Sequence, residues 1–277
     1  MSDQPIAPNR FVKGVPSEEY HRKVLGVYSN SAGKEFARSP MHYRYYLEAL
    51  PKPPTPELAF GTCLHTKVLE PELFDGQYIV SPEFGDCRNK ENKAARDRWI
   101  EANATKNAIT VEDWDRVNRM AEAVWNHSIA KQILDACKTP ELTGYWTDPL
   151  TGLQCKMRMD AWAADARVIG DIKTTTDASD DGFAKSIANF RYAYQAALYT
   201  LGAAEIIRNE SVDFVWIAVE KTEPYPVSTF QLSREDRLQT TDKLRAEMQR
   251  FKECVERDEW PGYGQGIREI SLPRWAK

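Results

Sequence analysis

Two acidic residues, Asp160 and Asp171, lie eleven positions apart on segments whose polar and apolar side chains alternate. An alternation with a period of two is typical of a half-buried β-strand. Residues 153–160 follow this pattern most closely, and residues 166–173 return after a short turn. The two segments therefore predict a β-hairpin that carries one carboxylate on each strand.

Carboxylates on neighbouring strands offer the hard oxygen ligands that Mg²⁺ or Mn²⁺ prefers. Lys173 shares a strand face with Asp171. Its ammonium could act on an attacking water or balance charge on a phosphoryl group. The alternative for an isolated Asp-x-Lys sequence is an exposed ion pair without a chemical role. Further candidate residues elsewhere in the chain are needed to distinguish between these two interpretations.

The composition limits the class of protein. A chain of 277 residues with 42% hydrophobic content can form one large globular domain. The net charge of -4 gives no overall basic field, so a nucleic-acid partner would need a local basic patch. Five cysteines without close pairs are typical of reduced thiols in a cytosolic protein. Because the chain shows neither a signal peptide nor a long apolar stretch, we expect a cytoplasmic protein without membrane contact.

The chain order of the expected elements predicts an α/β fold. Residues 1–28 are expected to form a flexible N-terminal arm, and residues 29–277 the folded domain. The helical spacing of apolar residues predicts helices over 39–50, 56–69, 111–136, 183–207 and 233–257, with a helix or ordered loop over 86–103. Alternating or apolar runs predict strands over 142–147, 153–160, 166–173, 212–219 and 227–232. This order is typical of a central mixed β-sheet flanked by helices.

Four more residues fall where they could complete a site. His65 lies on the predicted helix 56–69, and Glu141 comes just before a predicted strand. Gln195 and Tyr199 lie one turn apart on one helix face. The ordinary alternatives are a packed or capping role for His65 and a plain helix surface for the other pair. Five basic residues between positions 88 and 98 are interrupted by Glu91 and Asp97, which favours a solvated helix face over a phosphate track.

In this order, Glu141, Asp160, Asp171-Ile172-Lys173 and Gln195-Ala196-Ala197-Leu198-Tyr199 resemble the PD-(D/E)xK nuclease superfamily, RecB-like branch. Two flanking sequences, Gly61-Thr62-Cys63-Leu64-His65 and Trp260-Pro261-Gly262-Tyr263, make the chain resemble the RecE-like phage-type exonucleases (exonuclease VIII) more closely. The resemblance spans roughly residues 29 to 270 and makes residues 29–277 a nuclease domain. The second acid is aspartate instead of the glutamate of many superfamily members, as it is in RecE-like proteins.

The resemblance implies a metal site and a group that acts on water. His65, Asp160 and Asp171 would bind Mg²⁺ or Mn²⁺, and Lys173 would act on the attacking water. Glu141 would orient a ligand or the water.

Three further residues would lie beside the metal. Gln195 and Tyr199 would contact DNA or hold the catalytic groups in place. Arg158 is a candidate DNA contact, because it is expected on the same strand face as Asp160.

The resemblance also implies an activity and its partners. A RecE-like enzyme is a metal-dependent exodeoxyribonuclease that degrades the 5′-ended strand of linear double-stranded DNA and leaves 3′ single strands for recombination by annealing. It would act on DNA ends as a ring-shaped homo-oligomer, with a single-strand annealing recombinase as partner, in the cytoplasm of a bacterial or phage-infected cell. The alternatives are a structure-specific DNA endonuclease and a non-catalytic DNA-binding module with a nuclease fold.

Overall fold

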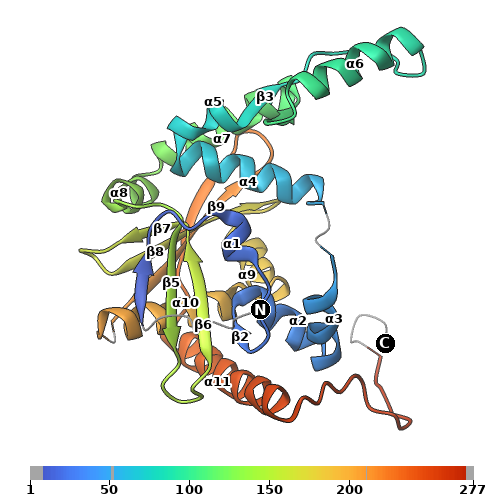
Figure 1. Ribbon diagram of the computed structural model, residues 1–277. Helices are drawn as coiled ribbons and strands as arrows, with labels where there is room; N and C mark the ends of the chain where they lie inside the picture. Colours follow the sequence, from blue (N-terminus) through green and yellow to red (C-terminus); the bar gives the residue numbers. More distant parts are fainter. Residues whose placement is uncertain (1–8, 51–52, 210, 273–277) are drawn as a thin grey trace.

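The computed structural model describes residues 9–50, 53–209 and 211–272 (Figure 1). The helices among these residues are α1 (Ser17–His21), α2 (Asn30–Arg38), α3 (Pro40–Glu48), α4 (Pro56–Leu69), α5 (Pro71–Gln77), α6 (Lys90–Ala102), α7 (Val111–Asn126), α8 (Ser128–Ala136), α9 (Asp180–Asn189), α10 (Tyr192–Ile207) and α11 (Arg234–Arg257). The strands are β1 (Arg10–Val12), β2 (Val27–Tyr28), β3 (Tyr78–Val80), β4 (Asn107–Ile109), β5 (Leu142–Thr147), β6 (Gln154–Met159), β7 (Ala161–Ala163), β8 (Val168–Thr175), β9 (Asp213–Glu220) and β10 (Val227–Phe230). None of the described helices is both long and apolar enough to cross a membrane.

Two four-stranded sheets form the centre of the fold. The first has the order β1-β5-β6-β2, with β2 parallel to β6 and the other neighbours antiparallel. The second has the order β10-β9-β8-β7, with β8 and β9 parallel and the other neighbours antiparallel. Strands β3 and β4 form a separate parallel pair. The predicted mixed α/β architecture is confirmed, although the strands form two sheets instead of one.

Helices cover both faces of the second sheet, and β9 shows why. Phe214 and Trp216 of β9 pack in a core that also includes residues of α2, α10 and α11. Val215 and Ile217 pack in a second core with residues of α4, α7 and α8. Alternate side chains of a strand point to opposite faces, so a strand that is apolar throughout has to be buried on both sides. Figure 1 shows α4, α7 and α8 on one side of the strands and α10 and α11 on the other.

The predicted long helices are interrupted at two places. The segment 111–136 is divided into α7 and α8 at His127, whose Nδ1 accepts a hydrogen bond from the Ala130 amide at 3.3 Å and so caps α8. The segment 183–207 is divided into α9 and α10 near Arg191, which has a left-handed φ of 58°. The apolar period continues through both breaks, and periodicity therefore did not reveal them.

The structure does not pair the two segments of the predicted hairpin with each other. The segment before Asp160 forms β6 as expected, but β6 pairs with β5 of the first sheet. The returning strand β8 pairs instead with the short β7, with Trp162 opposite Ile169. Asp160 consequently lies between β6 and β7, where the chain passes from one sheet to the other.

Residues 9–28, here called the strap, correct the expectation of a flexible arm over residues 1–28. Strand β1 pairs with β5, and β2 pairs with β6, with α1 between them. Strands of three and two residues are too short to show an alternation, which explains why the sequence did not reveal them. Residues 1–8 lie outside the described part of the chain.

Candidate active site

Three side chains with metal-binding atoms meet where the two sheets join. His65 comes from α4, Glu141 precedes β5, and Asp160 lies between β6 and β7. One ligand atom of each lies within 4.8 Å of the others. The Glu141 amide also donates to the Asp160 carbonyl at 3.1 Å. Glu141 has a φ of 51°, a conformation that costs energy for a residue other than glycine and is found most often at functional sites.

The hydrogen bonds of His65 leave one ring nitrogen directed at the carboxylates. Its Nε2 lies 2.9 Å from the carbonyl oxygen of Ile172. Since a carbonyl can only accept, Nε2 carries a hydrogen, and in the neutral form of the ring the lone pair lies on Nδ1. Nδ1 lies 3.5 Å from Asp160 Oδ2. Metal-binding histidines commonly donate their other N–H to a backbone carbonyl in this way.

Glu141 and Asp160 form an acidic pair in which the two carboxylates repel each other. Burial, and after it the neighbouring Asp160 carboxylate, raise the pKa of Glu141 to about 8, against the opposing effect of Arg158. Asp160 cannot move away easily, because its Oδ2 accepts a hydrogen bond from the Ile172 amide at 2.8 Å. A divalent cation would relieve this repulsion, and hard oxygen donors with one imidazole are suitable ligands for it.

Asp171 is held from two sides. Its side chain on β8 is 1% exposed. Gln195 Nε2 donates to Oδ1 at 2.7 Å, and Lys173 Nζ lies 2.5 Å from Oδ2. Burial raises the pKa of Asp171 to about 6, although Lys173 acts in the opposite direction. Burial alone would lower the pKa of Lys173, but the carboxylates of Asp171 and Asp160 outweigh it and raise that pKa, so Lys173 is an ammonium at neutral pH.

The metal ligands that the structure brings together differ in one residue from those predicted from the sequence. His65 and Asp160 are together as expected, but Glu141 takes the third place in their group. Asp171 lies next to it, close enough for the charge of Asp160 to act on its pKa, and is paired with Lys173. The residues present therefore fit a divalent cation held by His65, Glu141 and Asp160, with Asp171 at its border.

Gln195 and Tyr199 are enclosed in the protein. Both side chains are buried, with exposed fractions of 6% and 5%. Gln195 holds Asp171, whereas Tyr199 hydrogen-bonds to Tyr20 of the strap and to the backbone of Arg158. The sequence predicted that these residues contact DNA or hold catalytic groups in place. Side chains with so little exposed surface are better placed for the second of these roles.

Arg158, a predicted DNA contact, is bonded to the strap. Its guanidinium donates to the Val15 carbonyl at 2.6 Å and to Thr143 Oγ1 at 3.2 Å, and it lies 4.3 Å from the centre of the Tyr20 ring. Lys156, two residues earlier on β6, donates to the carbonyls of Tyr20 and Arg22. The polar face of β6 therefore fastens the strap over the first sheet.

Two further residues beside the site were not found from the sequence. Tyr192, the first residue of α10, has its ring centre 5.0 Å from Lys173 Nζ. Lys34 of α2 lies 5.8 Å from the same ring, and burial followed by repulsion from Lys173 lowers the pKa of Lys34. Neither residue belongs to a recognisable motif, and only the packing of α2 against α10 brings them to Lys173.

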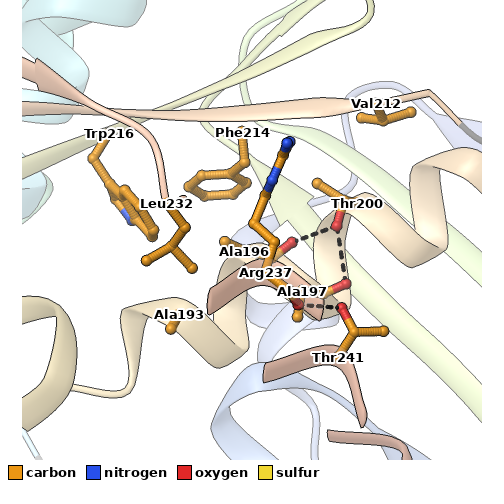
Figure 2. A pocket seen from close by; sticks show the side chains of 10 residues that line it. All are labelled: Ala193, Ala196, Ala197, Thr200, Val212, Phe214, Trp216, Leu232, Arg237 and Thr241. Atoms are coloured by element: carbon orange, nitrogen blue, oxygen red, sulfur yellow. Dashed lines mark hydrogen bonds between the residues drawn. The ribbon is translucent and has the colours of Figure 1, made fainter. Parts of the chain in front are cut away.

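A small cavity on another face of α10 lies apart from this site (Figure 2). It has a volume of about 40 Å³ and is enclosed between α10, β9 and the first turns of α11. Figure 2 shows Thr200 bonded to the carbonyls of Ala196 and Ala197 and Thr241 bonded to the carbonyl of Arg237. None of the residues grouped around Asp160 and Asp171 lines it, and its size suits a few water molecules at most.

Comparison with known proteins identifies the family of the chain. Residues 29–271 match the family described as a PDDEXK-like domain of unknown function (DUF3799). The chain belongs to this PDDEXK-like family. Its predicted membership of the PD-(D/E)xK superfamily is thereby confirmed, while the closer resemblance to RecE-like exonucleases stays a prediction.

A solved structure shares the fold over nearly the whole chain. A crystal structure described as a "Putative exonuclease" from Eubacterium rectale superimposes with a TM-score of 0.62. The match covers 95% of this chain and 96% of that chain at 13% identity, a level at which the likeness concerns the fold alone. No curated protein sequence matches the chain.

Proposed function

We propose that this PDDEXK-like protein is a metal-dependent nuclease that hydrolyses DNA. The observation that carries the proposal is the convergence of His65, Glu141 and Asp160 beside the Asp171–Lys173 ion pair. Phosphodiester hydrolysis requires an oriented water and compensation of the negative charge that builds up on the phosphate. A site with cation ligands on one side and a fixed ammonium on the other can provide both.

The bound divalent cation, Mg²⁺ or Mn²⁺, would supply a Lewis acid for the phosphate and lower the pKa of the attacking water. His65, Glu141 and Asp160 would hold it. Lys173 stays protonated in its ion pair, and its N–H groups can donate to the attacking water or to a phosphate oxygen. Asp171 and Gln195 keep that ammonium in one position, because the amide of Gln195 fixes the carboxylate that Lys173 faces.

The finer proposal is an exonuclease that degrades the 5′-ended strand of linear duplex DNA. It is supported by the resemblance to RecE-like enzymes and by a fold shared with a protein described as a "Putative exonuclease". A homo-oligomeric ring that encloses DNA and passes the 3′ strand to an annealing recombinase belongs to the same proposal. Such a ring would agree with the net charge of -4, because only its inner surface has to be basic.

The test compares linear duplex DNA labelled at the 5′ or the 3′ end with a closed supercoiled plasmid, in Mg²⁺ and in EDTA. We expect mononucleotides from the 5′-ended strand, an intact plasmid and no reaction in EDTA. Asp171→Asn should remove the activity, because it abolishes the ion pair with Lys173, and Glu122→Gln on the exposed surface of α7 is the matched control. Nicking of the plasmid would show an endonuclease and contradict the exonuclease proposal. Full activity in EDTA would reject the metal-dependent mechanism.

A further inference from the structure

A large open groove on α2 and α3 lies outside the candidate active site. It has a volume of about 700 Å³. Three large apolar side chains on its walls are exposed to an unusual degree: Met41 by 57%, Tyr45 by 67% and Leu50 by 85%. Exposed apolar groups that gather in one depression usually mark a binding surface.

The C-terminal segment adds a second aromatic ring beside this groove. The Met41 amide donates to the Pro261 carbonyl at 3.2 Å, which fixes the segment against α3. The ring of Tyr263 then lies 5.9 Å from the ring of His42 and remains 66% exposed. The guanidinium of Arg268 lies 5.9 Å from the centre of the Tyr263 ring. Tyr45 follows His42 by three positions on α3, so the accessible rings of Tyr45 and Tyr263 both neighbour His42.

Cationic groups connect the groove with the active site. Arg38 of α2 lines the groove, where it is paired with Glu35 at 2.7 Å. Lys34 precedes it by four residues, so the two side chains lie one turn apart on the same side of α2. Lys34 forms no ion pair with any described residue and faces the Tyr192 ring beside Lys173. Two cationic side chains, Lys34 and Arg38, therefore lie along α2 between the active site and the groove, and Glu35 is paired with Arg38.

We propose that the groove binds single-stranded DNA, with bases stacked on Tyr45 and Tyr263 and the backbone along Lys34 and Arg38. Aromatic rings combined with cations that follow a backbone are the usual means of binding single strands without sequence preference. The bases of an intact duplex are stacked inside the helix and cannot reach these rings. The inference rests on the proposed nuclease function, since the strand would be a substrate or product of the adjacent active site.

The experiment measures binding of a fluorescent 20-nucleotide oligo-dT to the full chain by anisotropy, in EDTA so that no cleavage occurs. Tyr45→Ala and Tyr263→Ala should each weaken binding about fivefold or more, because base stacking on one aromatic ring typically contributes that much. Tyr45→Phe keeps the ring and should bind within about twofold of the parent, as should the control Leu238→Ala, which shortens an exposed side chain on α11. Arg38→Gln should reduce the slope of log affinity against log salt by about 0.7, the loss of one phosphate contact.

The outcomes separate this inference from the proposed function. Unchanged binding by both tyrosine variants, or preference for duplex over single strand, would overturn it even if the parent cleaves DNA. If the parent does not cleave DNA but the tyrosine variants bind oligo-dT more weakly than the parent, the proposal for the groove stands and the proposed nuclease function is rejected. If Tyr45→Ala instead abolished a concentration-dependent increase in mass in light scattering, the groove would be a contact between copies of the chain. Equal thermal melting of all variants shows that the folded protein is being compared.

Discussion

The ionisation of Glu141 should govern how the stability of the metal-free protein depends on pH. The pKa of Glu141 is raised from its ordinary value of 4.5 to about 8. The folded state therefore keeps a proton that the unfolded chain releases. The corresponding stability is fully present below pH 4.5 and is lost as the pH rises to 8, at about 1.4 kcal/mol per pH unit.

The size of the effect follows from the same two pKa values. Between pH 6.5 and 8.0 the free energy of unfolding should fall by about 2 kcal/mol through Glu141 alone. Asp171, with a pKa of about 6, contributes in the same direction, but mainly below this window. Glu141→Gln resembles the protonated side chain and cannot ionise, so it should remove this part of the pH dependence.

The assay is urea denaturation in EDTA at pH 6.5 and 8.0. The parent should lose about 2 kcal/mol more between the two pH values than Glu141→Gln does, and the control Glu122→Gln should behave like the parent. Addition of Mg²⁺ at pH 8.0 should restore stability to the parent and much less to Glu141→Gln, because binding requires the ionised carboxylate. An equal pH dependence in the parent and in Glu141→Gln would refute the buried acidic pair with Asp160.

Three further changes test other parts of the site. His65→Ala should raise the Mg²⁺ concentration needed for half-maximal thermal stabilisation, and an unchanged titration would make His65 a structural histidine. Gln195→Leu leaves Asp171 Oδ1 without its donor and should destabilise the fold by about 1–3 kcal/mol in urea denaturation while lowering cleavage at least about tenfold, whereas unchanged values in both assays would contradict the contact. Deletion of residues 1–28 removes β1, β2 and the Tyr20 contact and should abolish cooperative thermal unfolding, whereas the control Glu122→Gln should melt like the parent; cooperative melting of the deletion variant would contradict the role of the strap.

Elements with strong local patterns could be predicted from the sequence. Helix α4 and strand β5 occupy the predicted residues, and the alternating run of β6 lies within its predicted range. The resemblance carried by Asp160, Asp171 and Lys173 together with the flanking motifs also indicated the right superfamily. These signals lie within short stretches of chain, where a residue's own type and its neighbours decide the structure.

Features that depend on contacts between distant segments could not be predicted. Glu141 joins His65 and Asp160 only because β5 starts beside the junction where β6 passes to β7. The strap is held by long-range contacts, as when Lys156 and Arg158 bond to backbone carbonyls more than a hundred positions earlier in the chain. The charged side chains of Lys156 and Arg158 would be expected at the solvent-exposed surface from the sequence alone, but in the fold they bind the strap.

The spacing of Gln195 and Tyr199 has a structural explanation that connects both sheets. Residues four apart on a helix lie on one face, so a single turn of α10 presents both side chains to the sheets. Gln195 bonds to Asp171 on β8 of the second sheet, and Tyr199 bonds to the backbone of Arg158, two residues before Asp160, at the end of β6 in the first sheet. The register of β7 and β8 sets Ala161 opposite Gly170, so the backbone already brings Asp160 beside Asp171, and Asp160 Oδ2 accepts a hydrogen bond from the Ile172 amide at 2.8 Å. One turn of α10 therefore adds a side-chain contact to Asp171 and another to the strand that leads to Asp160, and so supports the arrangement of the two carboxylates.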